Sequence, residues 1–313
     1  MTVPPTHAPV PATDRPLVRL VRRHPLTTFF TLAYLGSWLL WLPYILGPDG
    51  LGVLPGIALP ELLGNTQLAG VLPGAYIGPL GAAFLVTAIA GGRPALRAWR
   101  HRLAKWRVGV PWYLLALIGV PAVMVTATLA LPDATADIRL PGLEILAMYL
   151  PMLLIQIITT GLAEEPGWRD FALPIVQYRY GPTRGTALLG ALWAVWHFPL
   201  FGTQWSYAAD RLGRPEWFVT VGVFTASCFM ISFVITWVFN RTGQSLPVAM
   251  VLHAGVNNTA SVLLPVMFPA LPANQGLLPL LIAFSVAGVV VLAGTRGRLG
   301  YRRPGISPEP SQG

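Results

Sequence analysis

The chain has 313 residues and a formal net charge of +9, with 54% hydrophobic and only 11% charged residues. A soluble domain usually carries about 25% charged residues, so this composition excludes a water-covered surface and predicts an integral membrane protein. The positive charge alone would also suit a nucleic-acid partner. We expect none, because the basic residues lie in short segments between long apolar stretches. The single cysteine, Cys228, excludes an intrachain disulfide.

Apolar windows of the length that crosses a bilayer, about 20 residues, follow one another along the chain. They are residues 26–46, 67–91, 111–131, 142–163, 184–202, 217–240, 246–266 and 276–295. The sequence therefore predicts an all-α polytopic bundle of about eight transmembrane helices, forming a single membrane domain over residues 26–295. The Pro-rich tails, residues 1–25 and 296–313, are expected to be disordered. The first window lacks a small-residue cleavage pattern, which favours a retained helix over a secretory signal.

The basic residues predict the orientation of this bundle. With the N-terminus in the cytoplasm, only Arg139, Arg211 and Arg214 of the 21 basic residues fall on the opposite side. Cytoplasmic loops are enriched in Lys and Arg, so we expect both termini in the cytoplasm of a cell-membrane protein. The use of arginine for every basic residue but Lys105 suggests a GC-rich bacterial genome. The segment 92–110 fits either an amphipathic helix on an anionic membrane surface or an ordinary basic loop.

Three polar motifs interrupt the apolar windows or border them, and polar groups in membrane segments are costly and usually mark function. They are "AEEPGWR" at 163–169, "LWAVWHFP" at 192–199 and "VLHAGVNN" at 251–258. His197 and His253 are the two histidines embedded in apolar windows. Together with Glu164 they come from three spans, so a helix bundle could bring them together.

Helical spacing assigns these residues to faces. Glu165 and Arg169 are four apart and can form an ion pair, which leaves Glu164 about 100° away, facing other partners. Pro166 removes a backbone hydrogen bond and is expected to bend or interrupt the helix.

The other two motifs show the same spacing of four. His253 and Asn257 point the same way along one helix, and Trp193 precedes His197 by four residues and can wall its ring. Asn258 is expected to bridge helices, as amides in membranes commonly do.

Hydrolysis fits this set of groups. A carboxylate can take a proton from water, and a histidine can share that task or protonate the leaving amine. A second histidine and an asparagine N–H can stabilise an oxyanion. The motifs contain no serine or cysteine, so a covalent nucleophile is not suggested.

Two further possibilities remain open at this point. Glu164, His197 and His253 could instead ligate Zn²⁺ with an open position for water, although the usual H-E-x-x-H signature is absent. The alternative function classes are a transporter with a polar midplane site and a non-catalytic membrane scaffold.

The three motifs resemble those of the CPBP family, the CAAX-processing and bacteriocin-processing intramembrane proteases, also called Abi or type II CAAX prenyl endopeptidases. The resemblance rests on "EEPGWR", "WAVWHFPLF" and "RTGQSLPVAMVLHAGVNN", and covers residues 142–266.

The resemblance implies an endopeptidase that cleaves a membrane-associated, prenylated CAAX-type protein or peptide. It implies that Glu164 and His197 activate water and that His253 and Asn257 stabilise the oxyanion, while Glu165 and Arg169 support the site. Trp193 replaces a commoner phenylalanine, and Pro166 replaces a common apolar helix former.

The apolar windows pose a problem of depth for this site. They put Glu164 at a membrane edge and His197 thirteen residues into its span, roughly 20 Å away along the helix axis. We therefore expect the fourth helix to continue through "DFALPIVQYRY", residues 170–180, which moves Glu164 into the membrane. Glu164 should then lie within about one hydrogen-bonded water of His197.

Overall fold

The computed structural model describes residues 15–206 and 209–303, and within these ranges the regular structure is helical apart from one isolated bridge between Leu62 and Asn65. Among the described residues, eight helical stretches are long and apolar enough to cross a membrane. These stretches are Pro25–Leu46, Gln67–Leu103, Val110–Leu129, Leu143–Tyr180, Pro182–Gly202, Pro215–Arg241, Leu246–Met267 and Ala273–Gly294. The predicted all-α polytopic bundle is confirmed.

Several of these stretches contain more than one helical element. The α-helices are α1 (Pro16–Arg23), α2 (Pro25–Leu46), α3 (Gln67–Ala75), α4 (Ala82–Leu103), α5 (Val110–Leu114), α6 (Val120–Leu129), α7 (Leu143–Gln156), α8 (Leu162–Glu165), α9 (Leu173–Tyr180), α10 (Pro182–Trp196), α11 (Pro215–Arg241), α12 (Leu246–Asn258), α13 (Leu264–Met267) and α14 (Leu278–Gly294). The π-helical segments are η1 (Tyr76–Gly81), η2 (Leu115–Gly119), η4 (Ile157–Gly161), η5 (Pro166–Ala172) and η8 (Thr259–Leu263). Short 3₁₀ turns are η3 (Pro132–Ala136), η6 (Phe198–Gly202), η7 (Ala209–Arg211) and η9 (Ala273–Gln275).

Two of the π-helical segments, η1 and η5, contain a proline, Pro79 and Pro166 respectively. A π turn inserts one residue into the ladder of backbone hydrogen bonds, and such turns are frequent at functional sites. Pro166 begins η5 with helical dihedral angles, and the helix runs on through α9. The α-helical pattern is interrupted at Pro166 as expected, because α8 ends at Glu165 and η5 begins, while the backbone itself stays helical. The expected continuation through residues 170–180 is confirmed, because Leu143–Tyr180 forms one stretch.

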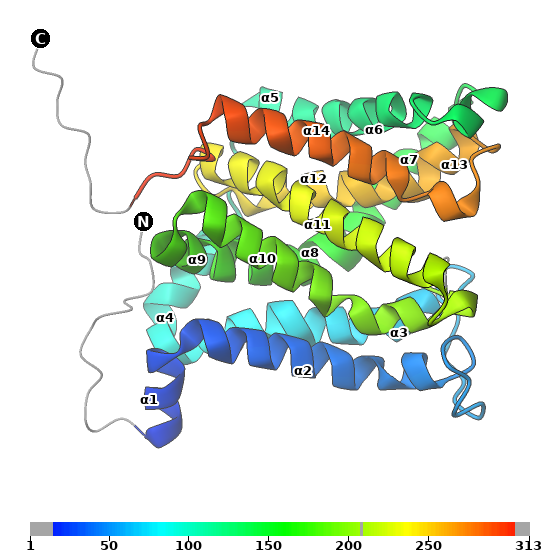
Figure 1. Ribbon diagram of the computed structural model, residues 1–313. Helices are drawn as coiled ribbons and strands as arrows, with labels where there is room; N and C mark the ends of the chain where they lie inside the picture. The colour runs from blue at the N-terminus through cyan, green and yellow to red at the C-terminus, as the bar shows by residue number, and fades with distance from the viewer. Residues whose placement is uncertain (1–14, 207–208, 304–313) are drawn as a thin grey trace, which may run out of the picture.

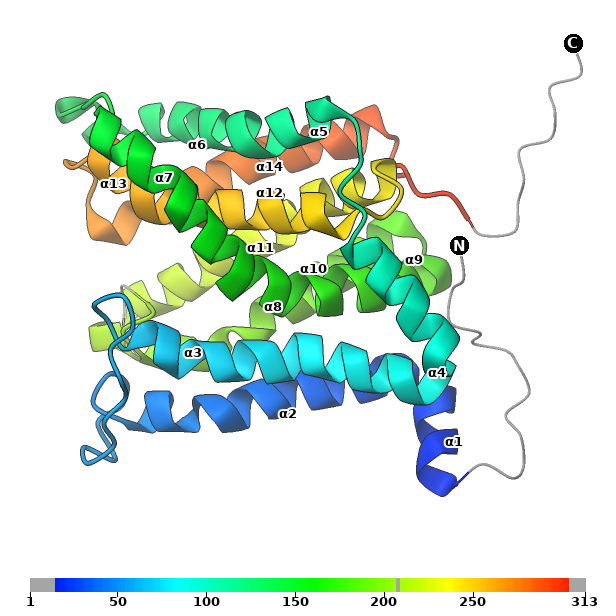
Figure 2. The same cartoon turned by 180° about the vertical axis from the view of Figure 1, so that it is seen from behind.

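The long helices lie side by side in a single bundle (Figure 1). Helices α2, α3 and α4 lie along one side and α5, α6 and α14 along the other, with α8, α10, α11 and α12 between them, as both views show (Figure 2). Small residues let neighbouring helices approach closely, as in other membrane bundles. A Cβ at Gly78 would overlap Ser37 of α2, and one at Gly190 would lie 2.9 Å from the Ser232 Oγ of α11.

Large apolar side chains are exposed along the outer helices, which is the surface expected of a protein surrounded by lipid. Leu39 of α2 is 61% exposed, Ile118 of η2 is 61% exposed and Val290 of α14 is 64% exposed. The site described below instead lies in the interior, where α8, η5, α10 and α12 pack together.

The first and last described residues lie at the same end of the bundle (Figure 1). The expectation that residues 1–25 are disordered is wrong for Pro16–Arg23, which form α1. This helix lies crosswise to the long helices (Figure 1). It buries Val21 against the bundle and leaves Leu17 and Leu20 exposed. Residues 1–14 are outside the described ranges.

The expected disorder of residues 296–313 is likewise wrong for the part that can be described. Leu299 is fully buried, and its carbonyl accepts a hydrogen bond of 2.9 Å from the Nδ2 of Asn240. Residues 304–313 are outside the described ranges.

The basic segment at 92–110 is helical up to Leu103, as the second half of α4, so the ordinary loop is excluded there. The backbone turns sharply at Gly92, where φ is 61° and ψ is −155°, a conformation that only glycine adopts readily.

Candidate active site

Glu164 is a buried carboxylate in α8, with 6% of its surface exposed. Its Oε2 accepts a hydrogen bond of 2.8 Å from the indole Nε1 of Trp193 in α10. No other donor to this carboxylate is found within residues 15–206 and 209–303, so Oε1 is available to another group. A single Trp193 donor therefore sets the position of Glu164.

Glu165 is fully buried and has different partners from its neighbour, as the helical spacing predicts. Its Oε1 accepts a hydrogen bond of 2.8 Å from the Nδ1 of His253 in α12. Its Oε2 lies 3.5 Å from the Nε of Arg169. Glu165 thus connects α8 to η5 and α12, while Glu164 faces α10.

Arg169 is fully buried, and its charge lies close to an aromatic ring and a carboxylate. Its guanidinium carbon lies 4.8 Å from the ring centroid of Trp193, a cation–π distance. Its guanidinium nitrogens have no hydrogen-bond partner within the described part of the chain. The Glu165 carboxylate is therefore the charge that offsets this buried cation, and removing either group would leave the other uncompensated.

His197 follows the last residue of α10, and one of its ring nitrogens is fixed by that helix. Nδ1 lies 2.9 Å from the carbonyl oxygen of Trp193. A carbonyl oxygen only accepts hydrogen bonds, so Nδ1 carries the proton and the neutral ring presents an unprotonated Nε2. The tautomer assigned in this way suits an acceptor for water.

An aromatic box fixes the plane of the His197 ring. Trp196 lies edge-on with 4.6 Å between ring centroids, Phe224 of α11 lies at 5.0 Å, and Trp205 stacks at 5.7 Å with an interplanar angle of 22°. These rings leave the histidine 7% exposed. The imidazole is therefore held in one orientation by this packing together with the hydrogen bond of its Nδ1.

Trp193 is the residue that joins the parts of this site. Besides its bond to Glu164, its ring meets His253 edge-on at 5.1 Å and His197 at 5.7 Å. The sequence suggested only that it walls His197, since spacing along one helix says nothing of its contacts with α8 and α12.

The structure brings Glu164, Glu165, Arg169, Trp193, His197 and His253 together through these contacts. Asn257 lies one helical turn after His253 on α12 and is partly exposed. Within the described residues, no hydrogen bond joins its side chain to the other candidates. Asn258 bridges two helices as expected, because its Nδ2 donates to the Tyr149 carbonyl of α7 at 3.0 Å.

The zinc alternative was tested against the positions of these side chains. Among the residues that the structure describes, no group of three or more His, Cys, Asp or Glu side chains is arranged to hold a metal ion. Glu164, His197 and His253 are thus not arranged as a ligand set, although their hydrogen bonds occupy only Oε2 of Glu164 and Nδ1 of each histidine. We therefore derive no catalytic step through a metal.

A third buried carboxylate, Asp170 in η5, is absent from the predicted site residues; it is 4% exposed and forms a two-pronged ion pair with Arg102 of α4. The signal was present: once the fourth helix continues through residue 180, Asp170 becomes an intramembrane charge that needs a partner. The aromatic box residues Trp205 and Phe224 carried no comparable signal.

Fold and site together define an α-helical, polytopic membrane protein with a buried carboxylate–histidine centre. Residues 146–259, which include every candidate site residue, match the sequence model of the Type II CAAX prenyl endopeptidase Rce1-like family. The chain is also 26% identical over 145 residues to CAAX prenyl protease 2 of Methanococcus maripaludis, covering 46% of this chain. It spans about half of that curated relative, since the aligned part is 50% of the relative's length. Both matches fall on the region of the three motifs and support their resemblance to the CAAX prenyl endopeptidases.

Proposed function

We propose that this protein is an intramembrane endopeptidase that hydrolyses a peptide bond in a membrane-associated protein or peptide. The name of the relative from Methanococcus maripaludis, CAAX prenyl protease 2, suggests a prenylated CAAX-type substrate. The observation that carries the proposal is the burial of Glu164 and His197 around a shared Trp193 within the matched region. Buried ionisable groups in membrane segments are costly and are retained for function.

In the proposed reaction Glu164 acts as the general base. Its Oε2 is held by Trp193, so Oε1 takes a proton from water while the water oxygen attacks the carbonyl carbon of the substrate. The Nε2 of His197 accepts a hydrogen bond from the same water and orients it. The C–N bond of the tetrahedral intermediate then breaks, and the proton held by Glu164 passes to the leaving amine.

His253 and Asn257 are proposed to stabilise the oxyanion of that intermediate. The bond from Nδ1 of His253 to Glu165 leaves Nε2 for the substrate, and the doubly protonated ring would donate from it. The side-chain N–H of Asn257 has no competing partner among the described residues and lies on the same helix face. Glu165 and Arg169 act as positioning residues, because they contact His253 and Trp193 rather than the reacting atoms.

The bundle end that carries both described chain ends is proposed to face the cytoplasm of a cell membrane. Support comes from the basic residues, of which only Arg139, Arg211 and Arg214 fall on the other side. Reporter fusions at the C-terminus that are active only in the cytoplasm test this orientation, and activity of a periplasmic or luminal reporter would contradict it.

Cleavage of quenched prenylated CAAX peptides and unmodified membrane peptides by the purified protein tests the proposal. Wild type and Glu164→Gln are compared, each with and without a chelator followed by added Zn²⁺. Turnover by wild type alone supports the protease, and the chelator arm decides the metal dependence. Equal background turnover by both folded proteins on every peptide would overturn catalysis by Glu164 and favour a non-catalytic scaffold.

A further inference from the structure

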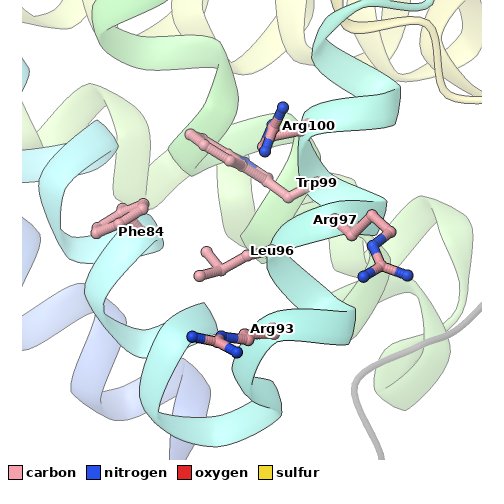
Figure 3. Close-up of a pocket in the computed structure, with 6 residues that line it drawn as sticks. All are labelled: Phe84, Arg93, Leu96, Arg97, Trp99 and Arg100. Carbon is pink, nitrogen blue, oxygen red and sulfur yellow. The ribbon is translucent and has the colours of Figure 1, made fainter.

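The second half of α4 encloses a hollow of about 410 Å³ that is separate from the candidate active site. It is lined by Phe84, Arg93, Leu96, Arg97, Trp99 and Arg100. Figure 3 shows Phe84, Leu96 and Trp99 between the two limbs of α4, with Arg93 at the turn and Arg97 on the outer side of the second limb. The hollow thus lies where an apolar span, Gln67–Leu103, passes into a basic segment.

The charge around this hollow is positive and uncompensated. Arg93, Arg97 and Arg100 are all exposed, and within the described ranges no acidic side chain pairs with any of them. Arg102, on the same helix, is instead neutralised by the buried Asp170. The three arginines are therefore free to meet an anion from outside the chain.

A polar group inside the hollow points to the same kind of ligand. Trp99 is 9% exposed, and its Nε1 has no hydrogen-bond partner among the residues described. A buried donor of this kind normally has an acceptor. Its ring lies 6.1 Å from that of Phe84, which is 49% exposed on the outer surface of the span. A ligand with an anionic oxygen and an apolar chain would satisfy both features.

The limb that carries the arginines is fixed to the bundle before any ligand binds. Arg102 holds it to η5 through Asp170, and the Lys105 carbonyl just beyond it accepts a hydrogen bond of 2.6 Å from the Oγ of Ser245. The hollow is therefore preformed, so binding need not order a mobile segment.

The neighbouring helix α1 shows that this end of the bundle lies at the membrane surface. It packs against α4 and lies crosswise to the spans, with Leu17 66% and Leu20 55% exposed and arginines at 15, 19, 22 and 23. Exposed leucines interleaved with arginines are typical of a helix lying in the bilayer interface. A hollow beside such a helix is placed to meet lipid headgroups.

We propose that this hollow is a binding site for an anionic glycerophospholipid of the surrounding membrane. The phosphate contacts Arg93 and Arg100 and accepts a hydrogen bond from Trp99, while Arg97 adds positive charge at the rim. An acyl chain lies along Phe84 and the apolar outer face of the span. The site is independent of the proposed protease activity, because none of its residues belongs to the candidate active site.

Native mass spectrometry of the full-length protein in detergent tests the proposal. It compares the affinity for phosphatidylglycerol with that for phosphatidylcholine, where both lipids carry the same acyl chains. The test variant is Arg93→Gln/Arg97→Gln/Arg100→Gln. The matched control, Arg179→Gln/Arg184→Gln/Arg298→Gln, removes three exposed arginines elsewhere on the protein and has the same net charge. Each arginine near an anionic surface contributes about fivefold, so the test variant should lose phosphatidylglycerol affinity by on the order of 100-fold. The control should retain affinity within a few fold.

Three outcomes would overturn the site. If both triple variants lose the same affinity for phosphatidylglycerol, the binding is general charge attraction. If the wild type binds phosphatidylcholine as tightly as phosphatidylglycerol, the hollow is an apolar groove without headgroup recognition. Displacement of phosphatidylglycerol by inorganic phosphate at equal concentration would show a small-anion site instead. Trp99→Phe keeps the ring and removes the donor to the phosphate, so it should weaken phosphatidylglycerol binding several fold; an unchanged affinity would overturn the proposed contact with Trp99.

Discussion

Replacing Trp193 by phenylalanine removes the hydrogen bond that positions Glu164 while retaining an aromatic ring. The indole Nε1 is the sole donor to the Glu164 carboxylate within the described residues, at 2.8 Å. A hydrogen bond to a charged group contributes about 1.5–3 kcal/mol. If that energy holds the carboxylate in its reactive position, kcat/KM of Trp193→Phe should fall by about 10- to 150-fold, because about 1.4 kcal/mol corresponds to a factor of ten.

The matched control for this variant is Trp168→Phe. Trp168 is also fully buried, but its Nε1 has no hydrogen-bond partner among the described residues, so the change removes packing alone. Both variants are assayed for peptide cleavage and for thermal unfolding in the same detergent. Trp168→Phe should retain kcat/KM within a few fold. A folded Trp193→Phe protein with wild-type kcat/KM would refute the positioning role, and would mean that Glu164 functions without this donor.

Three further changes probe other contacts of the site and the bundle. Arg169→Met leaves the buried Glu165 without its cation and should destabilise the protein by about 3–5 kcal/mol in denaturant unfolding; unchanged stability would show that the pair is dispensable. His253→Ala should lower kcat by about 100- to 1,000-fold with little change in KM, and a change in KM alone would place the residue in substrate binding instead. Gly78→Ala forces a Cβ against Ser37 and should cost about 1–3 kcal/mol of stability, whereas Gly142→Ala, which meets open space, should not.

Most of the fold was predictable because the dominant signal, an apolar run of bilayer length, is local in sequence. The exceptions occur where charges are neutralised by distant partners. The fourth window ended at Ala163 because four charged residues follow within seven positions. Arg102 and His253, the partners of Asp170 and Glu165, come from other spans, and this pairing lets Leu143–Tyr180 run as one helical stretch.

The site residues were predictable in identity but not in their pairing. The spacing of four assigned Glu165 to Arg169 and separated it from Glu164, and both assignments hold in the structure. Which carboxylate meets His253 and which meets Trp193 depends on the rotation of α8, α10 and α12 about their axes. That rotation is set by packing across the bundle, which no local spacing encodes. Helix α1 was missed because its short length and many arginines resemble a disordered tail.

The central claim is that Glu164 supplies the base that activates water. Single-turnover cleavage at saturating substrate, with wild type, Glu164→Gln and Asp170→Asn, tests it most directly. Glutamine can still accept the Trp193 hydrogen bond but cannot serve as the base. Asp170→Asn neutralises another buried carboxylate on the same helical stretch, one that pairs with Arg102 outside the site. The account predicts a loss of about 100- to 10,000-fold for Glu164→Gln and a rate near wild type for Asp170→Asn. Equal rates for wild type and a folded Glu164→Gln protein would contradict it.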